Sequence, residues 1–209
     1  ATILWSALSL IALLAFIFAP RTHRIYYDEN IYLHIGQSIA YTGRAQMVNF
    51  GEIKYGELFV NQAEYNKQPN AYPFLLSILY RIFGCREDLS FLFNNIVFVL
   101  SVLTIFGIAS LLFRSFKTGV YAALISAVIP QNILWHNTTS VEPSNTLFLA
   151  LTIFLTLSAI RSSSLGLYFL ALTSACFAAQ FRVESVLIFP LLLIIVGLTD
   201  RKVFRDQTL

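Results

Sequence analysis

Long apolar segments follow one another along this chain, and they limit what it can fold into. They cover residues 2–20, 89–113, 118–135, 143–160, 165–181 and 185–199. A helix that crosses a bilayer needs about 20 mostly apolar residues, and helices satisfy their backbone polar groups internally. With a mean hydropathy of +0.70 and 12% charged residues, these segments predict an all-α, multi-pass integral membrane protein with about six spans.

A polar stretch of the chain, residues 21–88, separates the first apolar segment from the others. It is rich in Tyr, Asn, Gln and Glu and must lie outside the hydrocarbon. We expect two interfacial helices in it, over 28–43 and 72–84. The second is apolar for only about thirteen residues and contains Arg81, which suits an interfacial or re-entrant helix better than a span.

The basic residues between the later segments indicate which side of the membrane each loop occupies. If 72–84 does not span, these residues all fall on one side: Arg114, Lys117, Arg161, Arg201, Lys202 and Arg205. The positive-inside rule makes that side cytoplasmic and places the loop 21–88 on the opposite face. We expect residues 1–209 to form one N-terminal transmembrane module of a longer chain.

Two adjacent carboxylates, Asp28 and Glu29, follow the first apolar segment. Asp28 can cap a helix, Glu29 suits its first turn, and Gly43 can end it. An acidic pair at the membrane surface could also accept a proton from a hydroxyl group. Spacing alone leaves both roles open, because the helix dipole favours an acidic first turn in any case.

Other polar residues gather at the same predicted ends of the later spans, whose interiors have no ionisable group. They are Lys67, His136, Glu142, Arg182 and Glu184. Ion-coupled transporters usually place such groups near the bilayer midplane, so the distribution favours an enzyme acting at the membrane surface. A net charge of +3 gives no reason to expect a nucleic-acid partner. Cys85 and Cys176 lie far apart and indicate neither a metal cluster nor a disulfide framework.

The order of these motifs resembles a known family of enzymes. The motifs are Asp28-Glu29 with Tyr32, Gly43, Lys67-Gln68-Pro69-Asn70-Ala71-Tyr72-Pro73, residues 119–130, Glu142 and Arg182-Val183-Glu184-Ser185. They resemble the GT-C superfamily of polytopic membrane glycosyltransferases, and within it the dolichyl-phosphate-mannose protein mannosyltransferases and aminoarabinose transferases. The resemblance implies a GT-C-like module of transmembrane helices with interfacial helices in the first outer loop.

The resemblance also implies an activity and roles for single residues. It implies inverting transfer of a sugar from a polyprenyl-phosphate donor to a hydroxyl acceptor on the non-cytoplasmic face of the plasma, inner or endoplasmic reticulum membrane. Asp28 matches the family's catalytic base, Glu29 its neighbour and Glu142 the second acid of the outer loops. Lys67 and Arg182 would bind the donor phosphate, supported by Tyr32, His136 and Glu184. We expect no cofactor to be required, although Asp28 and Glu142 could hold magnesium or manganese.

Several alternatives stay open at the level of sequence. The chain could be a transporter or flippase of lipid-linked sugars, or a non-catalytic membrane scaffold. Lys67 could be a solvated lysine, His136 an interfacial polar residue, and Arg182 and Glu184 a simple ion pair. A cavity beside Asp28 that opens to lipid would support the enzyme, a path through the membrane the flippase, and no cavity the scaffold.

Overall fold

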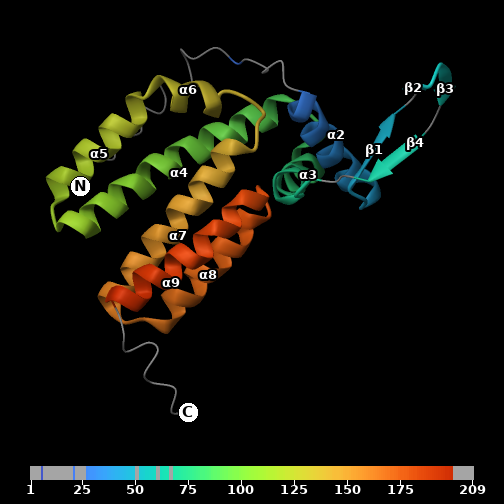
Figure 1. The fold of residues 1–209 in the computed structure, drawn as a ribbon. Helices are drawn as coiled ribbons and strands as arrows, with labels where there is room; N and C mark the ends of the chain where they lie inside the picture. Colours follow the sequence, from blue (N-terminus) through green and yellow to red (C-terminus); the bar gives the residue numbers. More distant parts are fainter. Residues whose placement is uncertain are drawn as a thin grey trace.

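Helices make up most of the fold (Figure 1). The computed structural model describes residues 6, 21, 27–49, 52–59, 62–65 and 68–199. Its helices are α2 (Tyr27–Thr42), α3 (Ala71–Phe83), α4 (Asp88–Phe113), α5 (Phe116–Val128), α6 (Pro130–His136), α7 (Glu142–Ser162), α8 (Leu165–Ala179), the short 3₁₀ helix η1 (Val183–Leu187) and α9 (Ile188–Thr199). Apart from residue 6, the predicted span over 2–20 lies outside the described residues, and so does Lys67.

Two of the described helices, α4 and α7, are each long and apolar enough to cross a membrane. The pair α5 and α6 would add a third span if the bent pair is counted as one, while α3, α8 and η1 with α9 are shorter apolar helices. Large apolar side chains are exposed on α4, α8 and α9, among them Leu92, Ile96, Leu100, Phe169, Leu170, Leu193, Ile194 and Leu198. Exposed apolar surface of this extent suits contact with lipid, and the chain is an all-α membrane protein.

Small residues let the long helices pack closely. Ala159 of α7 and Ala175 of α8 are fully buried, and the hydroxyl groups of Thr152 and Ser174 lie 3.0 Å apart between these two helices. Gly107 of α4 faces Phe154 of α7, where an added Cβ would come within 2.5 Å of the ring. Close approach through small residues is the usual basis of helix packing in membranes.

Helices α2 and α3 pack against each other at the end of the molecule where α4 and α7 begin and α8 ends (Figure 1). Ile35 of α2 and Leu76 of α3 are fully buried, and the backbone N–H of Ala71 donates to the carbonyl of Gln180 after α8, at 3.1 Å. The predicted helices over 28–43 and 72–84 therefore exist, with slightly shifted ends.

The end of α2 follows the signals in the sequence. Gly43 adopts a left-handed φ of 72°, and its N–H donates to the carbonyl of Ile39 at 3.0 Å. Arg81 of α3 donates to the carbonyls of Ile39 and Ala40, at 2.9 and 3.2 Å. A cation that bonds the last carbonyls of a helix also interacts favourably with the helix dipole, so Arg81 has a structural partner on α2.

A β-ribbon lies between α2 and α3, where the sequence predicts only a loop. Strand β1 (Gln46–Asn49) pairs antiparallel with β4 (Gln62–Tyr65), and β2 (Glu52–Lys54) pairs with β3 (Glu57–Phe59). Tyr55 and Gly56 both have positive φ at the tip, as a tight two-residue hairpin turn requires. The ribbon extends away from the long helices (Figure 1).

The apolar segment 118–135 contains two helices where one span was expected. Helix α5 ends at Val128, α6 begins at Pro130, and the two are bent by 64°. Pro130 is the first residue of α6, where proline's missing N–H costs nothing and its ring prevents continuation of the preceding helix. The bend directs α6 toward the start of α7, and the segment 137–141 connects the two helices.

Candidate active site

A cavity of about 460 Å³ lies at the end of the molecule formed by α2, α3 and the ends of the later helices. Its lining includes four acidic residues, Asp28, Glu29, Glu142 and Glu184, and one basic residue, Arg182. The remaining lining residues are Tyr32, Gln68, Pro69, Trp135, Ser140, Phe181 and Val183. Segments more than 100 residues apart in sequence thus contribute to one site.

Asp28 and Glu29 lie in the first turn of α2, which begins at Tyr27. Asp28 is therefore inside the helix, where an N-cap position was expected. Its side chain is exposed at the cavity, whereas Glu29 is only 2% exposed. The hydroxyl group of Thr139 donates to Oε2 of Glu29 at 3.1 Å. The two neighbouring carboxylates consequently have different environments, one accessible and one anchored in the protein.

The segment that carries Thr139, residues 137–141, is almost completely buried. Nδ2 of Asn94 on α4 donates to the carbonyls of Thr138 and Ser140, at 2.7 and 3.0 Å. The hydroxyl of Thr138 donates to the carbonyl of Trp135 at 2.6 Å, so the Ser140 hydroxyl, 2.6 Å away, must donate to Thr138. Asn137 is 1% exposed, and its burial makes the Asn-x-Thr sequence unsuitable for glycosylation in the folded protein.

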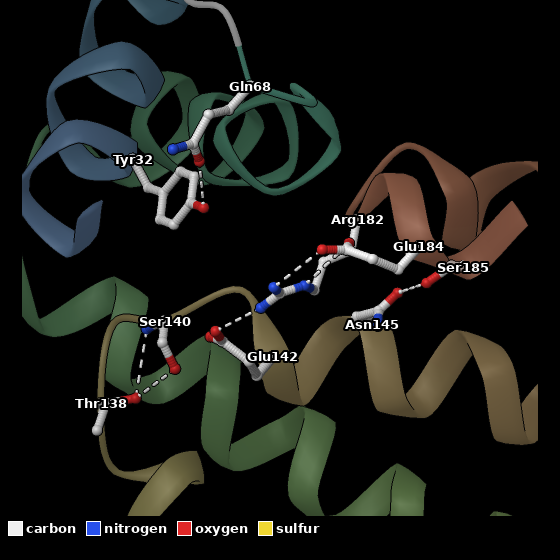
Figure 2. A network of polar contacts seen from close by, with 9 residues as sticks. All are labelled: Tyr32, Gln68, Thr138, Ser140, Glu142, Asn145, Arg182, Glu184 and Ser185. Carbon is white, nitrogen blue, oxygen red and sulfur yellow. Dashed lines mark hydrogen bonds and ion pairs between the residues drawn. The ribbon is translucent and has the colours of Figure 1, made fainter. Parts of the chain in front are cut away.

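Tyr32 lies one helical turn after Asp28 on the same helix. Its hydroxyl donates to Oε1 of Gln68 at 2.6 Å, which connects α2 with the segment before α3 (Figure 2). Burial, followed by the nearby charges of Asp28 and Glu142, raises the pKa of Tyr32 to about 12. The phenol therefore keeps its proton at neutral pH and remains a hydrogen-bond donor in the cavity.

Arg182 lies between two carboxylates, as Figure 2 shows. Its Nη1 is 2.9 Å from Oε1 of Glu142, and its Nε and Nη2 are 3.4 and 3.5 Å from the carboxylate of Glu184. The hydrogen bond to Glu184 is the main reason why the pKa of Arg182 is raised. Arg182 therefore stays a cation. The Glu184 side chain is 70% exposed, and an exposed, long pair of this kind contributes little to the stability of a protein.

The guanidinium group has more donors than these two carboxylates use. It has five N–H groups, and the bonds to Glu142 and Glu184 take three of them. One N–H on each of Nη1 and Nη2 has no partner among the described residues, and these two can contact two oxygens of one phosphate. The hydroxyl of Ser185 donates to Oδ1 of Asn145 at 2.7 Å (Figure 2) and attaches the segment after Arg182 to α7.

Two residues expected at the site are not part of this cavity as described. Lys67 lies outside the described residues, although its neighbours Gln68 and Pro69 line the cavity. His136 is 5% exposed and packs against Phe98, with ring centroids 4.9 Å apart. Its Nδ1 is 2.6 Å from the carbonyl of Asn132 and must donate to it. His136 thus packs and bonds at the end of α6 and does not line the cavity.

A metal centre has little support in the geometry. Among the described residues, no three His, Cys, Asp or Glu side chains gather closely enough to hold a metal ion. The expectation that no metal is required remains a prediction, because this observation does not test catalysis.

Sequence reasoning missed four residues that line the cavity, Gln68, Trp135, Ser140 and Phe181, and it also missed Thr139, which bonds Glu29. Gln68 lies inside a motif already noted, so its neighbours could have indicated it. The segment 137–141 gave no signal beyond its polarity between two apolar segments, because polar side chains in a presumed outer loop usually contact water. Its burial depends on the packing of α4, α6 and α7 around it.

A comparison with known protein families shows where the chain belongs. A family model described as dolichyl-phosphate-mannose-protein mannosyltransferase matches residues 67–209, more than half of the chain. The chain belongs to this family. Comparisons with curated proteins and with solved structures found no match.

Membership of the mannosyltransferase family makes the chain a membrane glycosyltransferase of the GT-C type. The matched region includes Glu142, Arg182 and Glu184 and begins after Asp28 and Tyr32. The first turn of α2 lies outside the matched region, but its residues Asp28 and Glu29 line the same cavity as residues of the matched region.

Proposed function

We propose that this chain transfers a sugar, with inversion, from a polyprenyl-phosphate donor to a hydroxyl acceptor on the non-cytoplasmic face of a multi-pass membrane module. The observation that carries the proposal is the shared cavity. An accessible carboxylate, Asp28, lines the same cavity as the guanidinium group of Arg182, two of whose N–H groups have no partner among the described residues. A base for the acceptor and a cation for the leaving phosphate are the two groups that this reaction needs.

The chemistry assigns each group a step. The acceptor oxygen attacks the anomeric carbon while Asp28 takes the hydroxyl proton, and a new C–O bond forms. The bond between the anomeric carbon and the phosphate oxygen breaks, and its electron pair stays on the polyprenyl phosphate. Arg182, with Lys67 as a further proposed cation, stabilises the charge that grows on that phosphate. Glu142 and Glu184 hold the guanidinium in place through their bonds to it.

The charge of the cavity limits how the donor can bind. Four carboxylates and one guanidinium line it among the described residues, so electrostatic attraction favours a phosphate anion beside Arg182 and repulsion disfavours it beside the carboxylates. A flippase would need no base, and a scaffold would need no cavity. The cavity beside Asp28 therefore favours the enzyme over the scaffold, and the accessible carboxylate favours it over the flippase.

The proposed activity can be tested directly with the purified membrane protein in nanodiscs. Dolichyl-phosphate [³H]mannose would be supplied with a peptide rich in serine and threonine, and undecaprenyl-phosphate sugars would be supplied in parallel. We expect label to enter the acceptor with the opposite anomeric configuration, in the presence or absence of EDTA. Absence of transfer from every polyprenyl-phosphate donor, or retention of configuration, would contradict the proposal.

The proposed face of the membrane leads to a labelling prediction. In a chain with Cys85 and Cys176 replaced by serine, cysteines introduced at Tyr55 and Val183, both exposed, should react with an impermeant maleimide from the same side. A cysteine at Ser163, in the turn between α7 and α8, should react only from the other side. Labelling of Tyr55→Cys and Val183→Cys from opposite sides would show that the proposed topology is wrong, because either α3 crosses the membrane or the bent pair α5 and α6 does not.

A further inference from the structure

The position of Asp28 depends on contacts that the proposed reaction itself does not use. Asp28 and Glu29 are consecutive residues, so their side chains point about 100° apart around the helix. The first turn of a helix has backbone N–H groups without partners further back in the helix. The orientation of the first turn of α2 therefore relies on bonds made by side chains. Glu29 makes one of these bonds, to Thr139.

Thr139 is itself held from both sides. It is fully buried, and the carbonyls of its two neighbours, Thr138 and Ser140, both accept hydrogen bonds from Nδ2 of Asn94. Asn94 is also fully buried, on α4, one of the two described helices long enough to cross a membrane. A series of hydrogen bonds, joined by the backbone of the segment 137–141, thus runs from α4 to the carboxylate of Glu29.

We propose that Thr139 and Asn94 are positioning residues, which fix Glu29 and thereby aim the carboxylate of Asp28 into the cavity. This inference rests on the proposed function, because Asp28 must act as the base for its aim to affect turnover. Neither Thr139 nor Asn94 lines the cavity, so both act through other residues. The donor phosphate binds at Arg182, whose contacts with Glu142 and Glu184 do not involve this series of hydrogen bonds.

The test compares Thr139→Val, which keeps the shape of the side chain but removes its hydroxyl, with Thr139→Ser, which keeps the hydroxyl. We expect Thr139→Val to lower kcat about 10- to 100-fold, as displacement of a catalytic group by about 1 Å does, while KM for dolichyl-phosphate [³H]mannose stays within about twofold of wild type. Thr139→Ser should restore most of kcat. Asn94→Leu should reproduce the fall in kcat with the same unchanged KM.

Thr173→Val is the matched control, because Thr173 is exposed on α8 and donates only to the carbonyl of Phe169 within its own helix. Its kcat should equal that of wild type. If Thr139→Val does not fold, Thr139→Cys takes its place, since a thiol is a weaker donor than a hydroxyl, and kcat should fall below that of Thr139→Ser.

Wild-type kcat in Thr139→Val, or in Thr139→Cys if it replaces that variant, would overturn the inference. An equal loss in Thr139→Ser would do the same. A fall in the thermal midpoint with an unchanged kcat for the folded protein would show a structural contact alone. If the wild-type protein transfers no sugar, the proposed function is contradicted. If the wild type transfers sugar and Thr139→Val does so with the same kcat, the proposed function stands and only the positioning role is contradicted.

Discussion

Replacing Asp28 by asparagine should lower turnover about 10²- to 10⁴-fold, the range that a general base contributes. Asparagine has nearly the same shape and can still accept hydrogen bonds in the first turn of α2, but it cannot take the acceptor's proton. Binding of the donor should change little, because Arg182 and its two carboxylate partners are untouched. Initial rates and donor affinity, measured on the same purified protein, separate these two effects.

Asp88→Asn is the matched control for this substitution. Asp88 is also an acidic residue in the first turn of a helix, it pairs with Arg86 on the surface, and it does not line the cavity. The control should keep full activity, because it changes only a charge in the first turn of α4 and an exposed ion pair. Wild-type turnover in Asp28→Asn would leave Asp28 as a helix-terminal residue without a role as base.

Replacing Arg182 by lysine should reduce turnover about 10²-fold or more, the cost of removing one preorganised donor to a developing negative charge. The guanidinium group can hold Glu142 and Glu184 and still present two N–H groups to a phosphate, whereas an ammonium has three donors in all. The effect should be greater on kcat than on donor affinity, because negative charge on the bridging oxygen grows mainly in the transition state.

Arg86→Lys provides the control for loss of an arginine pair. Arg86 donates from Nε and Nη2 to both oxygens of Asp88 at the exposed start of α4, much as Arg182 does to Glu184. Its replacement should change neither activity nor the thermal midpoint by a measurable amount. If Arg182→Lys lowers the thermal midpoint and the folded protein retains full turnover, the role of Arg182 is structural.

Many of the residues that line the cavity could be predicted from the sequence alone. Asp28, Glu29, Tyr32, Glu142, Arg182 and Glu184 were all singled out from the sequence, and the structure brings them to one cavity. The lengths of the apolar segments and the positions of the polar residues between them made this grouping predictable, because polar side chains that cannot enter hydrocarbon collect at the ends of the helices. The same reasoning did not separate cavity residues from residues near the cavity, so His136 was included with them.

The sequence by itself determined the mainly helical membrane architecture, the existence of α2 and α3, and the end of α2 just before Gly43. These depend on local properties: the length of apolar runs, the four-residue spacing of Ile31, Ile35 and Ile39, and the ability of glycine to adopt positive φ. Only the tertiary structure decided that Glu29 is anchored on Thr139 while Asp28 faces the cavity, and that Arg182 pairs with Glu142. Those contacts connect residues 40 and 110 positions apart, and they form only when packing of α2, α4, α7 and α8 brings the ends of these helices together.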